Sequence, residues 1–258
     1  MSFFPAFGAV FAIFIRLGFR KKRTRLFVFL AFLPLLLLAV IAIVGAFVES
    51  RDFSAPIFFS KIAPTYYLQF LVGIMAVFFS TSVLAEELDD KTLPYLTSRP
   101  APRGAVLLGK FTAYFAQMGA VLMAGVICSF VAANWERLDR WVVWADFLQF
   151  CFALLLALLT YGAVFLCLST FMKRTILFGL VYLFGFESFV QYLPGFTQKL
   201  TIIHYVKSLI PQVAVEYSFL VVRLQPSSLS GSILTLLFVS LAFLALGWLV
   251  FSRKEYVV

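Results

Sequence analysis

The sequence predicts an all-α polytopic membrane protein with six transmembrane helices, an amphipathic helix before the first and a short outer helical hairpin before the last. Hydrophobic residues make up 63% of the chain and charged residues 13%, whereas soluble domains have roughly 45–50% and about 25%. The apolar residues gather in runs of about 20, the length that a helix needs to cross hydrocarbon. With 258 residues, we expect a single membrane domain over 1–258 and no sizeable soluble domain.

The first segment, residues 3–25, predicts an interfacial helix on the inner membrane surface. Residues 3–15 are apolar but too short to span, and they run into a basic end that suits anionic lipid. The alternative is a frayed tail. The apolar positions at helical spacing are Phe3, Phe7, Val10, Phe14 and Leu17. The basic positions are Arg16, Arg20, Lys21, Lys22, Arg23 and Arg25.

Six runs of membrane length follow, at about 26–47, 62–84, 105–132, 145–170, 175–193 and 231–251. Pro34 in the first run removes one internal hydrogen bond, so we expect a bend there. Residues 194–230, between the last two runs, are apolar enough to resemble a seventh span, but charged residues and proline interrupt them. We therefore expect a helical hairpin on the outer face. The interrupting residues are Lys199, His204, Lys207, Pro211 and Glu216.

The distribution of Lys and Arg predicts that both termini are cytoplasmic. With an inside amino terminus, fourteen of the 21 basic residues fall on the inner side. Inner loops carry the excess of Lys and Arg in membrane proteins. The basic residues also lie at the ends of apolar runs rather than along one exposed face, which argues against nucleic-acid binding and for contact with membrane lipid.

The loop at 85–104 is the longest densely charged stretch between two spans, and we expect it to dock on another protein in the cytoplasm. Thr92 can cap a short helix, Pro94 is tolerated in its first turn, and Leu93, Tyr95 and Leu96 supply an apolar surface. Four carboxylates precede this helix. An alternative is that they hold a divalent cation or are simply solvated. They are Glu86, Glu87, Asp89 and Asp90.

The stretch from Glu87 to Lys110 resembles the signature of the type 2 ATP-binding-cassette (ABC-2) exporter permeases. The matching positions are the acidic pair Glu87 and Asp89, then Thr92, Leu93, Leu96, Ser98, Pro100, Leu108, Gly109 and Lys110. Lys91 stands where the family usually has glycine, and Pro94 is unusual. These departures bear on where the docking helix starts.

The resemblance implies a coupling helix seated on a cytoplasmic ABC ATPase subunit, present in two copies that carry ATP and Mg²⁺. This chain would have no cofactor, no metal and no catalytic residue. It would pair with a second permease copy or a paralogue in the bacterial plasma (inner) membrane and export a substrate that the sequence does not identify. The residues implied in ATPase docking are Glu86, Glu87, Asp89, Asp90, Thr92, Leu93, Tyr95 and Leu96.

Other motifs do not support chemistry on this chain. Residues 104–111 read GAVLLGKF, close to a phosphate-binding loop, but Phe111 has no hydroxyl for Mg²⁺ and no strand precedes Gly104. We expect Lys110 to snorkel towards the inner surface instead. His204 is the single histidine, so we expect a surface or packing residue. The three cysteines lie in apolar runs without metal-type spacing, which indicates packing. They are Cys128, Cys151 and Cys167.

Glu187 lies near the middle of the predicted fifth span, where an ionised carboxylate costs about 2.5–3.5 kcal/mol. It could contact a substrate or take up a proton. Alternatively, it is a protonated acid bonded to Tyr182, Ser188 or Gln191 at a helix interface. Two further functions therefore stay open beside the exporter permease: a stand-alone carrier or channel that uses Glu187, and a membrane scaffold that anchors an ATPase.

Overall fold

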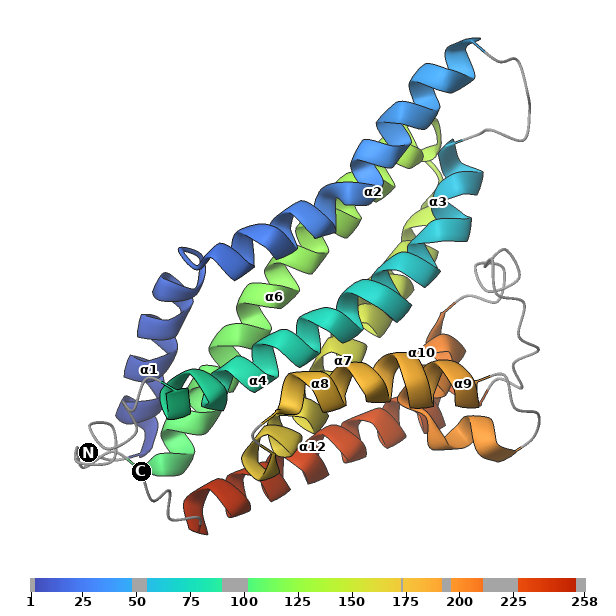
Figure 1. Ribbon diagram of the computed structural model, residues 1–258. Coiled ribbons are helices and arrows are strands. Elements are labelled where there is room, and N and C mark those ends of the chain that lie inside the picture. Colours follow the sequence, from blue (N-terminus) through green and yellow to red (C-terminus); the bar gives the residue numbers. More distant parts are fainter. Residues whose placement is uncertain are drawn as a thin grey trace.

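The computed structural model describes residues 3–47, 55–89, 102–172, 174–191, 196–210 and 227–253. Within these ranges the chain is helical and contains no strand (Figure 1). Wide π-type turns form η1 and η3, and tight 3₁₀ turns form η2 and η4. The elements in chain order are α1 (Phe3–Gly18), α2 (Lys22–Phe47), α3 (Ala55–Ala63), η1 (Pro64–Val72), α4 (Gly73–Asp89), α6 (Arg103–Ala133), η2 (Trp135–Arg137), α7 (Trp141–Phe171), α8 (Thr175–Leu180), η3 (Val181–Glu187), α9 (Ser188–Val190), η4 (Phe196–Leu200), α10 (Ile202–Leu209) and α12 (Leu229–Arg253).

Five helices are long and apolar enough to cross a membrane. They correspond to five of the six predicted spans and lie at Lys22–Ile41, Pro64–Thr81, Gly104–Ala133, Trp141–Phe171 and Leu229–Arg253. The remaining predicted span, 175–193, is the shorter apolar helix Thr175–Val190. At ~1.5 Å per residue it is about 24 Å long, less than the ~30 Å hydrocarbon core. Six spans of full length are therefore not present in the described residues.

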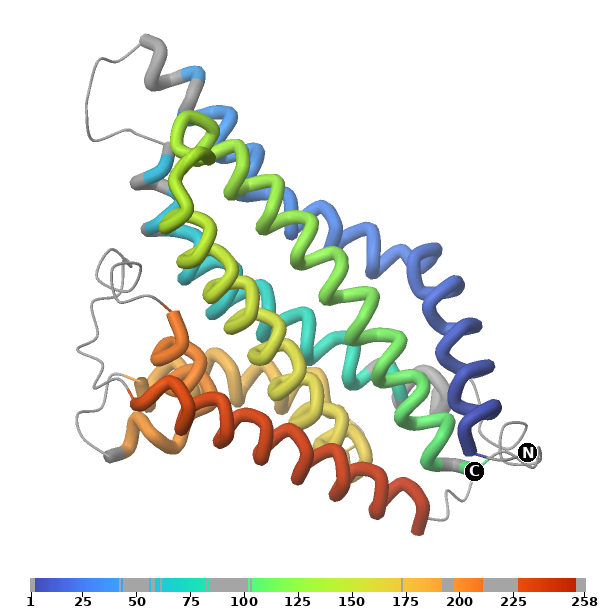
Figure 2. The backbone as a smooth tube through the Cα atoms, turned by 180° about the vertical axis from the view of Figure 1, so that it is seen from behind, coloured from blue at the N-terminus to red at the C-terminus, as the bar shows by residue number. Residues whose placement is uncertain are grey.

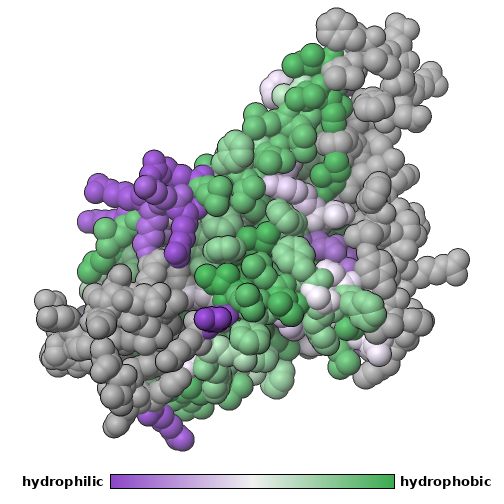
Figure 3. Space-filling model, in the orientation of Figure 1, coloured by the Kyte–Doolittle hydropathy of each residue, from purple (hydrophilic) through white to green (hydrophobic). Residues whose placement is uncertain are grey.

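The predicted amino-terminal helix over 3–25 is divided in two. Helix α1 ends at Gly18, and α2 begins at Lys22, because the Thr24 hydroxyl donates to the carbonyl oxygen of Gly18 at 2.7 Å and closes the corner. The basic residues consequently belong to both helices. Five of them are exposed and form the hydrophilic patch where α1 meets α2 (Figure 3). They are Arg16, Arg20, Lys22, Arg23 and Arg25.

Helix α7 lies at the centre of the bundle and packs against α12, α4, α10 and α6. Its fully buried side chains include Leu154, Tyr161 and Phe165. The outermost helices, α2 and α12, expose large apolar side chains such as Val40 and Phe238, and hydrophobic surface covers much of the visible face (Figure 3). An apolar exterior over a packed interior is the pattern of a protein whose solvent is lipid.

The membrane-length segments alternate in direction along the chain (Figure 1). Helix α1, the start of α6 and the end of α12 lie at one end of the molecule, here called the α1 end (Figure 2). The η2 turn and α10 lie at the opposite end, the α10 end. Of the predicted outer segment 194–230, the structure describes η4, helix α10 and the first residues of α12. Residues 211–226 lie outside the described part of the chain.

Candidate functional site

The charged connector predicted to dock on a partner lies between α4 and α6. Helix α4 continues to Asp89, about one turn beyond the predicted end of the second span, so Glu86, Glu87 and Asp89 belong to its last turns. Their side chains are outside the described part of the chain. The other implied docking residues, Asp90, Thr92, Leu93, Tyr95 and Leu96, lie wholly outside the described ranges. The docking helix therefore stays a prediction.

Lys110 joins the helices that carry this connector. Its side chain is only 2% exposed, so the prediction that it snorkels to the membrane surface is wrong. The Nζ atom donates to the carbonyl oxygen of Val83 in α4 at 3.4 Å and lies 4.7 Å from the ring centroid of Phe14 in α1. An ammonium held by a carbonyl and an aromatic face keeps part of the stabilisation that it loses on leaving water. Lys110 thus joins α6 to both α4 and α1.

Close helix contacts hold α1 against α6. A Cβ atom on Gly109 would lie 3.1 Å from the carbonyl oxygen of Phe7, and a Cβ atom on Gly18 would overlap the side chain of Gln117. The Gln117 amide nitrogen donates to the hydroxyl of Thr24 at 3.2 Å. Small residues permit such close backbone approach between membrane helices. The α1–α2 corner is therefore fixed to the bundle at the α1 end.

The glycine pattern at 104–111 does not form a phosphate-binding loop. These residues are helical in α6, and the amides of Ala105 and Val106 already donate to the carbonyl oxygen of Pro102. A phosphate cradle requires free, convergent amides. Gly104 instead gives room to Trp248 of α12, whose Nε1 would overlap a Cβ atom at that position. This glycine serves helix packing.

Glu187 lies in the last turns of the helix Thr175–Val190, nearer its end than the predicted middle. It is 4% exposed and accepts hydrogen bonds from the hydroxyl of Tyr161, from the hydroxyl of Tyr182 at 3.3 Å and from the amide of Ile202 at 3.1 Å. Ile202 is the first residue of α10. A carboxyl group at this position bonds a helix amide that has no partner within the helix and favours the positive end of the helix dipole.

Of the partners predicted for Glu187, only Tyr182 is found. The Ser188 hydroxyl donates to Leu183 instead, and the Gln191 side chain accepts from Lys207 Nζ at 2.9 Å. Tyr161 and Ile202 were missed because they are distant in sequence, and no local pattern indicates them.

Further hydrogen bonds fix the carboxyl end of α10, opposite the end that Glu187 bonds. At its carboxyl end, Gln149 of α7 donates to the carbonyl oxygen of Leu209 at 2.7 Å, and the amide of Ser227 donates to the hydroxyl of Ser208 at 3.2 Å. His204 lies 3.1 Å from the hydroxyl of Ser227 through Nε2 and is buried, so it is a packing residue. Burial, and then the charge of Lys199, lower the pKa of His204. Burial lowers the pKa of Lys207 to about 8, and the Glu187 carboxylate partly opposes this effect.

No group of three potential metal ligands occurs within the described ranges. The side chains of the acidic residues that precede the connector lie outside those ranges, so the cation-binding alternative for them stays open.

The apolar, lipid-type exterior and the five membrane-length helices define an integral, polytopic helical membrane protein. Residues 6–256 match the family described as ABC-2 family transporter protein. Because the match covers nearly the whole chain, the protein belongs to the ABC-2 transporter family. No curated protein matches the chain. Permeases of this family are typically non-catalytic membrane subunits and generally pair with ABC ATPases.

Proposed function

We propose that this chain is the permease subunit of an ABC exporter, which forms the substrate path and couples to a separate cytoplasmic ATPase. The family match over residues 6–256 supports the class. Support for the coupling comes from the geometry at the α1 end, where Lys110 joins α6 to α4 and α1. A buried cation bridges the two helices that flank the connector. A force applied to the connector would therefore be transmitted to both helices.

The rest of the proposal is what membership of the ABC-2 transporter family implies. Two ATPase subunits hold ATP and Mg²⁺, and each seats the connector of one permease. Two permeases, either identical or paralogous, enclose the path, since the helices of one chain are too few to surround it. The α1 end faces the cytoplasm of a bacterial cell, where the exposed basic patch of α1 and α2 meets anionic lipid. The substrate class is left open.

The contacts of Glu187 favour this function over a stand-alone carrier. A carrier site must reach its cargo and exchange partners during transport. The carboxyl group of Glu187 is instead 4% exposed and accepts three hydrogen bonds from Tyr161, Tyr182 and Ile202. These contacts support a role in joining helices.

Co-purification tests the coupling. The tagged chain, co-expressed with a candidate ATPase and extracted in mild detergent, should carry the ATPase in stoichiometric amount. Replacing Leu93→Asp together with Tyr95→Asp should release it. The matched control is Trp135→Asp, which places the same charge on an exposed aromatic residue at the α10 end. Retention of the ATPase by the double variant, or failure of any ABC ATPase to bind the wild type, would exclude the proposed coupling.

A further inference from the structure

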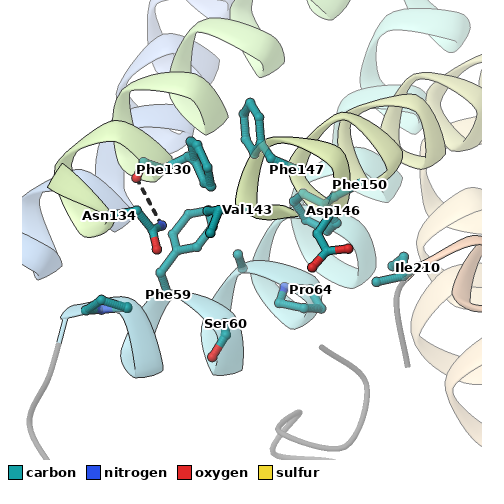
Figure 4. Close-up of a pocket in the computed structure, with 12 residues that line it drawn as sticks. Phe59, Ser60, Pro64, Phe130, Asn134, Val143, Asp146, Phe147, Phe150 and Ile210 are labelled. Atoms are coloured by element: carbon teal, nitrogen blue, oxygen red, sulfur yellow. Dashed lines mark hydrogen bonds between the residues drawn. The ribbon is translucent and has the colours of Figure 1, made fainter. Parts of the chain in front are cut away.

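A cavity of about 190 Å³ opens at the α10 end between α3, α6 and α7 (Figure 4). It is remote from the connector at the α1 end. Its walls are aromatic: Phe130 stacks on Phe147 with a centroid separation of 3.8 Å, and Phe59 meets Phe130 edge-on at 6.0 Å. For comparison, an engineered apolar cavity of ~150 Å³ binds benzene. The cavity therefore accommodates about one ring or a short branched chain.

Besides the hydroxyl of Ser60, which can both donate and accept, the polar side chains of this cavity are acceptors. Asn134 is 8% exposed, and its Nδ2 donates to the carbonyl oxygen of Phe130 at 3.2 Å. Because a carbonyl oxygen can only accept, the NH₂ group of the Asn134 side chain, and not its oxygen, must face Phe130. This bond therefore fixes which way round the side-chain amide lies. The Oδ1 atom then faces the cavity beside Phe59 (Figure 4). Among the described residues, no donor reaches it.

Asp146 gives the cavity a negative charge. Its carboxylate lines the cavity on the side of Pro64 and Ile210, across Phe59 and Val143 from Asn134 (Figure 4). Within the described part of the chain it has no hydrogen-bond or ion-pair partner. The neighbouring cations Arg137 and Arg140 are exposed and do not line the cavity. An anionic acceptor therefore stands at one side of an apolar chamber and a neutral acceptor at the other.

We propose that this cavity binds a small organic ammonium ion with one apolar ring or chain. The ammonium group bonds to the Asp146 carboxylate, while the apolar part lies among Phe59, Phe130 and Phe147 on the side of Asn134. Aromatic faces also attract a cation directly. An anion would meet the carboxylate and a lone pair of the amide oxygen, so it is rejected. A neutral compound keeps only the apolar contacts.

This site does not depend on the proposed ATPase coupling, because it uses only residues at the opposite end of the molecule. The two hypotheses can therefore fail separately. A permease without the ammonium site and an ammonium-binding membrane protein without an ATPase are distinguishable outcomes.

Binding to the detergent-purified full chain tests the site. The probe is 2-phenylethylammonium, compared with neutral 2-phenylethanol and anionic 3-phenylpropanoate of similar size, with empty micelles subtracted. Calorimetry or ligand-observed NMR should show about tenfold tighter binding of the cation than of the alcohol, since one close charge pair near a protein surface is worth about this factor. The anion should show no binding above the micelle background.

Three variants locate the binding. Asp146→Asn should weaken the cation about tenfold and leave the alcohol unchanged. Val143→Trp, which fills the cavity, should abolish binding of both compounds. Asp139→Asn is the matched control, because this exposed acid lies in the same region but outside the cavity. Equal affinity for cation and alcohol, or an unchanged affinity in Asp146→Asn, would overturn the proposal. Since Asp146 is exposed, its variant should fold even if Val143→Trp does not.

Discussion

The hydroxyl of Tyr66 donates a hydrogen bond of 2.6 Å to the carbonyl oxygen of Leu30. Leu30 stands four residues before Pro34, so this is the carbonyl that the missing amide of proline leaves without a helical donor. The adjacent hydroxyl of Tyr67 lies 3.0 Å from the carbonyl oxygen of Ala31. Helix α2 therefore continues through Pro34. Hydroxyl groups of the second span bond the carbonyl oxygens of Leu30 and Ala31, and such partners are what a membrane helix with an internal proline requires.

Removing this donor should destabilise the protein more when proline is present than when it is replaced. Tyr66→Phe is expected to lower the free energy of unfolding by about 0.6–1.7 kcal/mol, the range of interhelical hydrogen bonds in membranes. In a Pro34→Ala background the restored amide bonds Leu30, so the same change should have a smaller effect. Unfolding in mixed micelles, arranged as a double-mutant cycle, measures the coupling. Strictly additive effects would contradict the assignment.

The approach of α2 to α6 depends on Gly125. A Cβ atom there would lie 2.4 Å from the carbonyl oxygen of Ala31, whereas one on Gly119 of the same helix meets only Leu155 at an ordinary 3.4 Å. We expect Gly125→Ala to destabilise by about 1–3 kcal/mol. Gly119→Ala should be neutral or slightly stabilising, because alanine favours the helix. Similar thermal melting of the two variants would show that α2 and α6 are not in this contact.

The carboxyl group of Glu187 should protect the first amides of α10. Glu187→Ala removes the acceptor of the Ile202 amide, and hydrogen exchange at Ile202 and Ile203 should accelerate about tenfold, equivalent to one lost hydrogen bond. Glu187→Gln should have a smaller effect, because its side-chain oxygen can still accept. Ser188→Ala is the control, since its hydroxyl bonds within its own helix. Unchanged exchange in Glu187→Ala would refute the role of this contact.

A transport assay on Glu187→Gln, combined with the hydrogen-exchange measurement, distinguishes a structural role of Glu187 from a chemical role. If Glu187→Gln retains both protection of α10 and full transport, the carboxylate charge is not needed. Loss of transport with α10 still protected would instead assign a chemical function to the charge.

The environment of Lys207 gives a pH dependence. Its pKa falls from the ordinary 10.5 to about 8 on folding, so the unfolded chain binds more protons between these values. Stability should therefore rise with pH from about 8 to 10.5. Lys207→Met removes this contribution. The melting temperature of the wild type minus that of the variant should therefore increase between pH 7.5 and 9.5. Parallel pH profiles would show that Lys207 is not desolvated.

Labelling tests which end faces the cytoplasm. In a background without Cys128, Cys151 and Cys167, a membrane-impermeant maleimide should label Trp135→Cys in intact cells and Ser98→Cys only after lysis. Trp135 is exposed in η2 at the α10 end. The reversed pattern would place the connector outside the cell and exclude docking on a cytoplasmic ATPase.

The sequence predicts most of the helices because the thickness of hydrocarbon sets their length. Where the sequence-based prediction is wrong, a contact with a residue distant in the sequence determines the structure. The apolar run after Thr175 continues to Leu193, but the helix ends at Val190, and Glu187 in its last turns bonds the start of α10. Nothing in the run itself indicates that partner. Lys110 was expected at the surface because the α1 residue that covers it, Phe14, lies far away in the chain.

The shared contact at Lys110 also has a mechanical consequence. Lys110 holds α1, α4 and α6 together, so under the proposed coupling a rotation of α4 and α6 would also move α1 across the lipid headgroups. The proposed coupling therefore predicts that the lipid around α1 affects the rate of transport.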